Sequence, residues 1–220
     1  TGTRIWEAVS DSVNVADELY DIDASGFGKV VFTGASGLTC VAEAYNALTG
    51  AFIWRSIYNS TSTVEEHGVK IGQSTAGAVA VLVRGNTSFV SRFTTIQLNG
   101  STGALQWANI YTGTTSSREP IDLIVEPTGR VVAAGYKTNG GAPNYDFILV
   151  GYSSTGAQVF VNEYTNPGST SEFLYSMCRD QQGNYILAGC TEDDFLNEYL
   201  FHPLIIKYGS SRSEERRVGK

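Results

Sequence analysis

The chain has 220 residues, with 24 glycines and 12 tyrosines but only 17% charged residues. That length can bury a substantial core, and this composition favours an all-β chain with many turns over a helical bundle. No apolar run is long enough to span a membrane. The formal charge is −7, and without the four basic and two acidic residues of the last nine positions it is −9, which makes nucleic acid and anionic lipid surfaces poor partners.

A turn glycine followed four residues later by an aromatic residue recurs along the chain. The glycines stand at positions 2, 50, 103 and 156, which are 48, 53 and 53 residues apart. The four pairs are Gly2 and Trp6, Gly50 and Trp54, Gly103 and Trp107, and Gly156 and Phe160. A fixed period of about fifty residues is typical of repeat architectures, so we expect these residues to be structural.

A second marker, a short apolar run between two glycines, keeps the same period. It lies between Gly28 and Gly34, Gly77 and Gly85, Gly129 and Gly135, and Gly183 and Gly189. In the first unit we predict strands over 19–23, 29–33, 39–46 and 51–58. The second strands are almost continuously apolar, which indicates that both of their faces are covered. Blades of a β-propeller meet that condition, whereas a β-sandwich does not explain the period.

The predicted fold is therefore an all-β propeller of four-stranded antiparallel blades in a single domain over 1–211. It would contain an orphan strand at 2–9 and blades at 17–59, 67–112, 119–165 and 172–208, the last without its fourth strand. The orphan strand would complete that last blade if the ring closes within this chain, and six to eight blades are expected in a longer chain. Residues 212–220 share nothing with the repeats and resemble a translated sequencing adapter.

Two bacterial repeat families resemble these motifs. The set Ala44, Asn46, Thr49, Gly50 and Trp54 resembles the tryptophan-docking motif of quinoprotein (PQQ-type) propeller repeats. The second unit has Gln97 in place of the alanine, and the third has Phe160 in place of the tryptophan. The segments 144–156, 180–189 and 203–208 resemble SBBP-type repeats of secreted and surface proteins. Both resemblances imply a propeller, and neither implies one activity.

Candidate metal ligands come from two acidic clusters. Asp21 and Asp23 alternate like the ligands of a calcium loop, but Phe32 stands at the twelfth position, so an ordinary hairpin turn is favoured. Asp193 and Asp194 follow Glu192 on what we expect to be a solvated loop. His67 and His202 are far apart in sequence, and we assign no catalytic, cofactor or metal site; calcium and PQQ remain alternatives as cofactors.

The three cysteines are Cys40, Cys178 and Cys190. Cys178 and Cys190 flank one predicted hairpin about four residues out of step, so we expect buried free thiols and no disulfide.

The leading functional hypothesis is a non-enzymatic binding or scaffold module that is extracellular, on the cell surface or periplasmic. Its partner would be a protein or a carbohydrate, bound through the rim loops or the central channel. The alternatives are part of a PQQ-dependent quinoprotein dehydrogenase and a periplasmic assembly-factor propeller that binds protein partners.

Overall fold

A computed structural model describes residues 2–10, 15–26, 28–60, 65–86, 91–111, 118–138, 144–167, 171–195, 198–210 and 216–217; for 193–195, 198–199 and 216–217 it describes the backbone alone. The strands are β1 (Asp17–Asp23), β2 (Lys29–Ser36), β3 (Thr39–Asn46), β4 (Phe52–Tyr58), β5 (Glu65–Gln73), β6 (Ala78–Asn86), β7 (Ser91–Asn99), β8 (Leu105–Ile110), β9 (Arg118–Val125), β10 (Val131–Thr138), β11 (Tyr145–Tyr152), β12 (Gln158–Tyr164), β13 (Ser171–Arg179), β14 (Tyr185–Phe195), β15 (Glu198–Tyr208) and β16 (Arg216–Arg217). Within these residues there is no helix that is long and apolar enough to cross a membrane.

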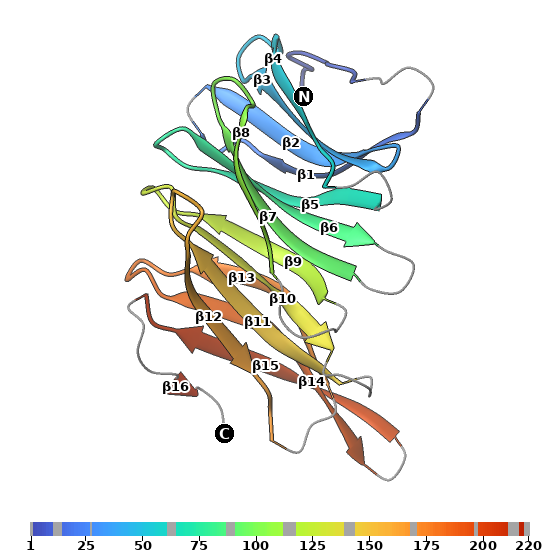
Figure 1. Cartoon of the computed structure of the whole chain (residues 1–220), viewed down its shortest axis with the longest axis vertical. Coiled ribbons are helices and arrows are strands. Elements are labelled where there is room, and N and C mark those ends of the chain that lie inside the picture. Colours follow the sequence, from blue (N-terminus) through green and yellow to red (C-terminus); the bar gives the residue numbers. More distant parts are fainter. Residues whose placement is uncertain are drawn as a thin grey trace.

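The strands form four antiparallel sheets, and in each sheet neighbouring strands follow one another along the chain. Sheet A contains β1–β4, sheet B β5–β8, sheet C β9–β12 and sheet D β13–β16. The sheets lie face to face in the order A, B, C, D, and the first strand of each contacts the first strand of the next (Figure 1). The fold is thus a β-propeller of four-stranded antiparallel blades, with β1, β5, β9 and β13 innermost.

Apolar side chains of adjacent sheets form the core. One cluster joins sheets A and B, a second joins B and C, and a third joins C and D. The second strands are buried on both faces; the residues from Val79 to Val83 in β6, for example, are at most 1% exposed. This double burial explains why these strands read as continuous apolar runs rather than as alternating ones.

A β-bulge interrupts the first strand of every sheet and explains one of the two glycine markers. Gly34, Gly135 and Gly189 lie opposite the bulges, where an added Cβ would come within about 2 Å of a backbone carbonyl oxygen of the first strand. In sheet B the position that corresponds to these three glycines is Val83 on β6. Its partner across the ladder is Gly68 on β5, so here the first strand supplies the glycine. Gly85 was therefore aligned wrongly by two residues, because the sequence does not show which strand of a pair supplies the glycine.

The N-terminal segment corrects the predicted closure. Residues 2–10 form no strand, and they lie against sheet A, whereas sheet D is at the other end of the stack (Figure 1). The orphan strand therefore does not complete the last blade of its own chain, because Trp6 fixes it to the turn between β3 and β4. Instead β16, two residues of the predicted adapter tail, pairs with Ile206 and Lys207 of β15.

Candidate functional site

The repeated tryptophans dock the N-terminal segment onto sheet A, sheet A onto sheet B and sheet B onto sheet C. The indole Nε1 of Trp54 donates a 2.9 Å hydrogen bond to the carbonyl oxygen of Gly100, in the turn between β7 and β8. Trp6 donates in the same way to Ala47, at 3.0 Å, and Trp107 to Ser154, at 3.2 Å. The ring of Trp6 lies over Gly50, that of Trp54 over Gly103 and that of Trp107 over Gly156. These tryptophans therefore hold neighbouring parts of the fold together.

The turn glycines under these rings are Gly50, Gly103 and Gly156. All three have a positive φ, and an added Cβ would lie within 2.8 Å of the docked indole. An L side chain would therefore be strained twice, by the backbone conformation and by the ring above it. The glycine of each Thr-Gly turn is thus the residue on which a tryptophan ring packs.

Two members of the repeat set differ from the others. Gly2 is exposed and has no atom within 4 Å of an added Cβ, so no ring covers it. Phe160 has no N–H to donate; it lies over Gly151 of its own sheet, and its ring centroid is 6.0 Å from that of Tyr185.

The candidate calcium ligands Asp21 and Asp23 bind the neighbouring blade. Asp21 Oδ2 accepts the backbone N–H of Ile71 at 2.9 Å, and Asp23 Oδ2 accepts that of Gln73 at 2.8 Å. Asp23 Oδ1 also accepts the N–H of Ser25 within its own turn, at 2.6 Å. Both carboxylates therefore satisfy N–H groups at the junction of sheets A and B.

Asp122 does the same between sheets C and D. Its Oδ2 accepts the N–H of Met177 at 2.6 Å and the hydroxyl of Ser176 at 3.1 Å. Asp21 and Asp122 hold the same place beside the bulge of their first strands, so this inter-blade contact occurs twice in the fold.

We expect Asp122→Ala to lower the free energy of unfolding by about 1.5–3 kcal/mol, because the buried N–H of Met177 loses a charged acceptor. Urea unfolding followed by tryptophan fluorescence would measure the change. Glu7→Ala is the matched control, since the side chain of Glu7 is exposed and pairs with the exposed Arg4. Equal stability of the two variants would contradict the inter-blade role of Asp122.

The second acidic cluster lies in a strand and not in a loop. Glu192, Asp193 and Asp194 belong to β14 and pair in register with residues 199–201 of β15. The side chains of Asp193 and Asp194 lie outside the described residues. Among the side chains that are described, no group of three or more His, Cys, Asp or Glu residues is placed to hold a metal ion.

Ionisable and aromatic side chains gather along the innermost strands of sheets A and B. The bulge of β1 carries Tyr20, whose ring stacks on that of His67 in β5 with centroids 5.7 Å apart. The Tyr20 hydroxyl donates to Glu18, a contact that raises the pKa of Tyr20. His67 Nε2 lies 3.0 Å from a carboxylate oxygen of Glu65. We call Glu18, Tyr20, Glu65 and His67 the inner-strand site.

One polar atom of this site is unused. Nδ1 of His67 is buried and has no hydrogen-bond partner among the described residues. Tyr20, by contrast, remains 43% exposed. A bulge re-aims a side chain out of the sheet, which explains how Tyr20 meets a residue of the next blade and still faces solvent. His202, the second histidine, lies in β15 and is exposed, away from this site.

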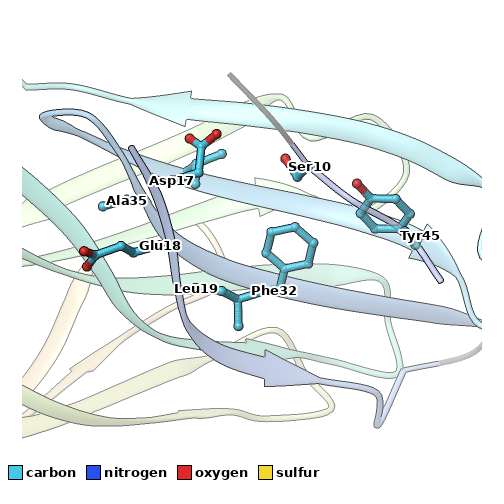
Figure 2. Close-up of a pocket in the computed structure, with 9 residues that line it drawn as sticks. Ser10, Asp17, Glu18, Leu19, Phe32, Ala35 and Tyr45 are labelled. Carbon is cyan, nitrogen blue, oxygen red and sulfur yellow. The ribbon is translucent and has the colours of Figure 1, made fainter. Parts of the chain in front are cut away.

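A separate cavity of about 150 Å³ lies between the N-terminal segment and sheet A (Figure 2). Its lining includes Ser10 from the N-terminal segment, Asp17 from β1, Phe32 from β2 and Tyr45 from β3. Residues 2–10 cover this face of sheet A less completely than a whole sheet covers the corresponding face of sheet B. The cavity is the space that remains.

A buried ionic network lies beside this cavity. Glu43, only 1% exposed, pairs with Arg55 at 3.2 Å and accepts the hydroxyls of Ser10 at 2.5 Å and Tyr45 at 2.7 Å. Burial and the hydrogen bond to Glu43 raise the pKa of Tyr45 to about 12. The aligned residues in sheets B, C and D are Ile96, Val150 and Ile206.

Sequence reasoning missed both the inner-strand site and the ionic network of Glu43. Aligning the repeats strand by strand would have shown Glu43 among Ile96, Val150 and Ile206. It would also have placed Tyr20 at the bulge, level with Tyr175 of β13. A position-by-position comparison of the blades therefore identifies residues, such as Glu43, that differ from the apolar residues at the same position of other blades.

The three cysteines are free, and only part of that prediction is confirmed. Cys40 and Cys190 are buried, but Cys178 is exposed. In the ladder between β13 and β14, Cys178 lies opposite Ile186, and Cys190 lies opposite Phe173. Cys190 is thus four residues along β14 from the residue that faces Cys178. Burial raises the pKa of Cys40 to about 12.

We therefore expect a single fast phase when the folded protein reacts with a thiol reagent such as DTNB at pH 8. The fast phase belongs to Cys178, because Cys40 and Cys190 are both buried and Cys40 also remains protonated. Cys178→Ser should remove the fast phase, and addition of denaturant should restore full labelling of the remaining thiols. Fast labelling that persists in Cys178→Ser would contradict this assignment.

No protein-family model matches the chain, and no curated protein matches it. Among solved structures it is similar to a glycoside hydrolase, with 13% identity and a TM-score of 0.49 over 91% of this chain and 49% of that one. It is also similar to a quinohemoprotein alcohol dehydrogenase from Pseudomonas putida HK5, with 9% identity and a TM-score of 0.44 over 88% and 46%. An endo-arabinase from Bacteroides thetaiotaomicron VPI-5482 matches with 10% identity and a TM-score of 0.40 over 86% and 73%.

The chain thus spans about half the length of the first two of these structures, at 49% and 46%. All three of these TM-scores are below 0.5, and it is the four antiparallel sheets that define the fold. No family model supports either repeat family.

Proposed function

We propose that this protein is a non-enzymatic binding or scaffold module that works at the cell surface, in the extracellular space or in the periplasm. The observation that supports a binding role is the inner-strand site. An exposed tyrosine ring stacks on a histidine that has a buried, unused nitrogen, and two carboxylates flank the pair. Aromatic faces with nearby hydrogen-bonding groups suit a sugar ring or a polar protein segment.

The test uses native electrophoresis in gels that contain a panel of neutral and acidic polysaccharides. We expect at least one polysaccharide to retard the protein, and Tyr20→Ala to weaken binding about 3–10-fold, the usual contribution of one aromatic contact. Leu48→Ala is the control, because Leu48 is also exposed but lies in the turn between β3 and β4.

Equal retardation of Tyr20→Ala and the parent would contradict the placement of the site. Cleavage of the retarding polysaccharide by the protein would contradict the non-enzymatic role. If no polysaccharide retards the protein, the carbohydrate ligand is excluded and a protein partner is the form of the proposal to test.

The second candidate is part of a PQQ-dependent dehydrogenase, favoured by the tryptophan docks, which fit the quinoprotein resemblance. It predicts that adding PQQ and calcium produces dye-linked oxidation of alcohols. The absence of dye reduction with both additions would rule this activity out for the chain.

A further inference from the structure

A second cavity, of about 140 Å³, lies between sheets A and B, where β2 begins and β5 ends. Lys29 of β2 lines one side of it, and Gln73 and Ser74 line the other. The remaining lining residues are Thr75, Gly77, Ala78 and Val79. Gln73 and Ser74 are only 8% and 5% exposed, so the polar part of the lining is held by the packing of two neighbouring blades.

Contacts from both sheets fix the position of Lys29 at this cavity. The side-chain amide of Gln73 donates to the carbonyl oxygen of Lys29 at 3.4 Å and to that of Asp23 at 3.0 Å. The Lys29 ammonium donates to the carbonyl oxygen of Gly100, in the turn between β7 and β8. An ammonium has three N–H donors, so it can donate two further hydrogen bonds.

Lys29 also has no carboxylate partner among the residues that the structure describes. Asp23 belongs to the same junction, but its oxygens accept the backbone N–H groups of Ser25 and Gln73. The ammonium therefore has its charge balanced by no ion pair within the described chain.

The other blades show what the position of Ser74 holds when it is charged. The ladders align Ser74 with Glu126 of sheet C and Asp180 of sheet D, and each of the three donates its N–H to the carbonyl oxygen four residues on. Both acids pair with a cation: Glu126 with Arg179 at 3.5 Å and Asp180 with Lys207 at 2.6 Å. Sheet B alone of these three has no carboxylate at this turn.

The seam between sheets A and B therefore has the cation without the acid. Lys29 and Ser74 line the same cavity, so an ammonium lies where the aligned turns of the next two sheets hold a paired carboxylate. The Ser74 hydroxyl accepts the N–H of Ala78 at 3.1 Å, which leaves its own proton to be donated. The cavity thus offers hydrogen-bond donors and one positive charge to a ligand.

We propose that this cavity binds the carboxylate of a small organic acid, with Lys29 as counter-ion and the hydroxyls of Ser74 and Thr75 as further donors. A volume of about 140 Å³ has room for about four to five groups of the size of a water molecule, which suits acetate or propionate but not a sugar ring. Ala78 and Val79 give the alkyl end of the acid an apolar wall.

A carboxylate fits this position better than a phosphate does. The groups that sheets C and D place at the aligned turn are themselves carboxylates, and the chain carries a net charge of −7, which disfavours a doubly charged anion. The site is separate from the inner-strand site, which lies toward the start of β5, and its test does not depend on the proposed binding role.

The first test is a titration of the ¹⁵N-labelled full chain with sodium acetate, followed in ¹H–¹⁵N NMR spectra. We expect saturable shifts of the amide signals of Ser74, Thr75 and Gly77, with a dissociation constant on the order of 1–10 mM for so small a ligand. Sodium chloride at the same ionic strength is the reference. Shifts that fail to saturate, or that chloride reproduces, would overturn the proposal, and tighter binding of inorganic phosphate would overturn the assignment to a carboxylate.

The second test removes the cation. Lys29→Met should raise the dissociation constant for acetate about tenfold or more, because the ligand loses a charged hydrogen-bond donor. Lys70→Met is the matched control: Lys70 lies at the same junction, but its ammonium is already 3.5 Å from a carboxylate oxygen of Asp21. Equal acetate binding by the two variants would contradict the role of Lys29.

The third test supplies the acid from within the chain. Ser74→Asp gives sheet B the carboxylate that sheets C and D have, so it should pair with Lys29 and abolish acetate binding. Ser74→Asn has nearly the same size without the charge and should retain more of the binding. Native dispersion of the other amide signals shows that each variant is folded. Undiminished acetate binding in Ser74→Asp, or an equal loss in both variants, would overturn the proposal.

Discussion

Replacing Trp54 with alanine is expected to lower the free energy of unfolding by about 3–5 kcal/mol, the usual cost of removing a large buried aromatic side chain. Trp54 is 4% exposed and belongs to the core cluster between sheets A and B. Its loss removes the ring above Gly103 and leaves the carbonyl of Gly100 without its indole donor. Guanidinium unfolding, followed by far-UV circular dichroism, would measure the effect.

Two further variants separate packing from hydrogen bonding at this dock. Trp54→Phe keeps a ring but no donor, so we expect a loss that exceeds one hydrogen bond of about 1 kcal/mol but stays below that of the alanine variant. Trp107→Ala should cost less than Trp54→Ala, because Trp107 is only half-buried. If Trp54→Ala and Trp107→Ala were equally destabilising, burial would not be the source of the effect.

Removing Arg55 should be the second large effect. Arg55→Ala leaves Glu43 charged in a site where it is 1% exposed, and an uncompensated buried charge costs about 3–5 kcal/mol. The hydroxyls of Ser10 and Tyr45 still donate to Glu43, so the lower end of that range is expected. The same unfolding measurement applies.

The double variant makes this prediction specific. Glu43→Ile places at this position the residue that sheets B and D have there, Ile96 and Ile206, and so removes the charge that Arg55 balances. Replacement of a buried ion pair by apolar residues is often neutral or stabilising. Arg55→Ala combined with Glu43→Ile should therefore recover most of the lost stability. Failure to recover would show that Arg55 contributes through packing or through Asp17, 3.9 Å away, and not through Glu43.

Local patterns in the sequence were sufficient for the blades. Strand β3 begins at Thr39 and ends at Asn46, as expected, because a glycine turn follows it and its residues alternate between two buried faces. The Thr-Gly turns and the doubly buried second strands are properties of neighbouring residues, and their period showed that the fold repeats. The all-β propeller was predictable for that reason.

The candidate site was predictable only in part. Asp21 and Asp23 were identified as candidate ligands from their spacing, but their acceptor oxygens are used by N–H groups of Ile71 and Gln73, 50 residues away. Tyr20 and His67 are ordinary in sequence and meet only because a bulge turns Tyr20 toward the next blade. Such contacts depend on how two sheets pack, which no local pattern specifies.

The sequence by itself determined that the chain is a series of β blades joined by aromatic docks, because turn glycines and apolar strands act through their immediate neighbours. Only the tertiary structure decided where the N-terminal segment lies and which carboxylates are occupied. Trp6 finds its acceptor 41 residues along the chain, at Ala47 of sheet A, and thereby keeps residues 2–10 away from sheet D. The physical reason is that a dock requires a specific carbonyl and an uncovered turn glycine in space, and packing places both.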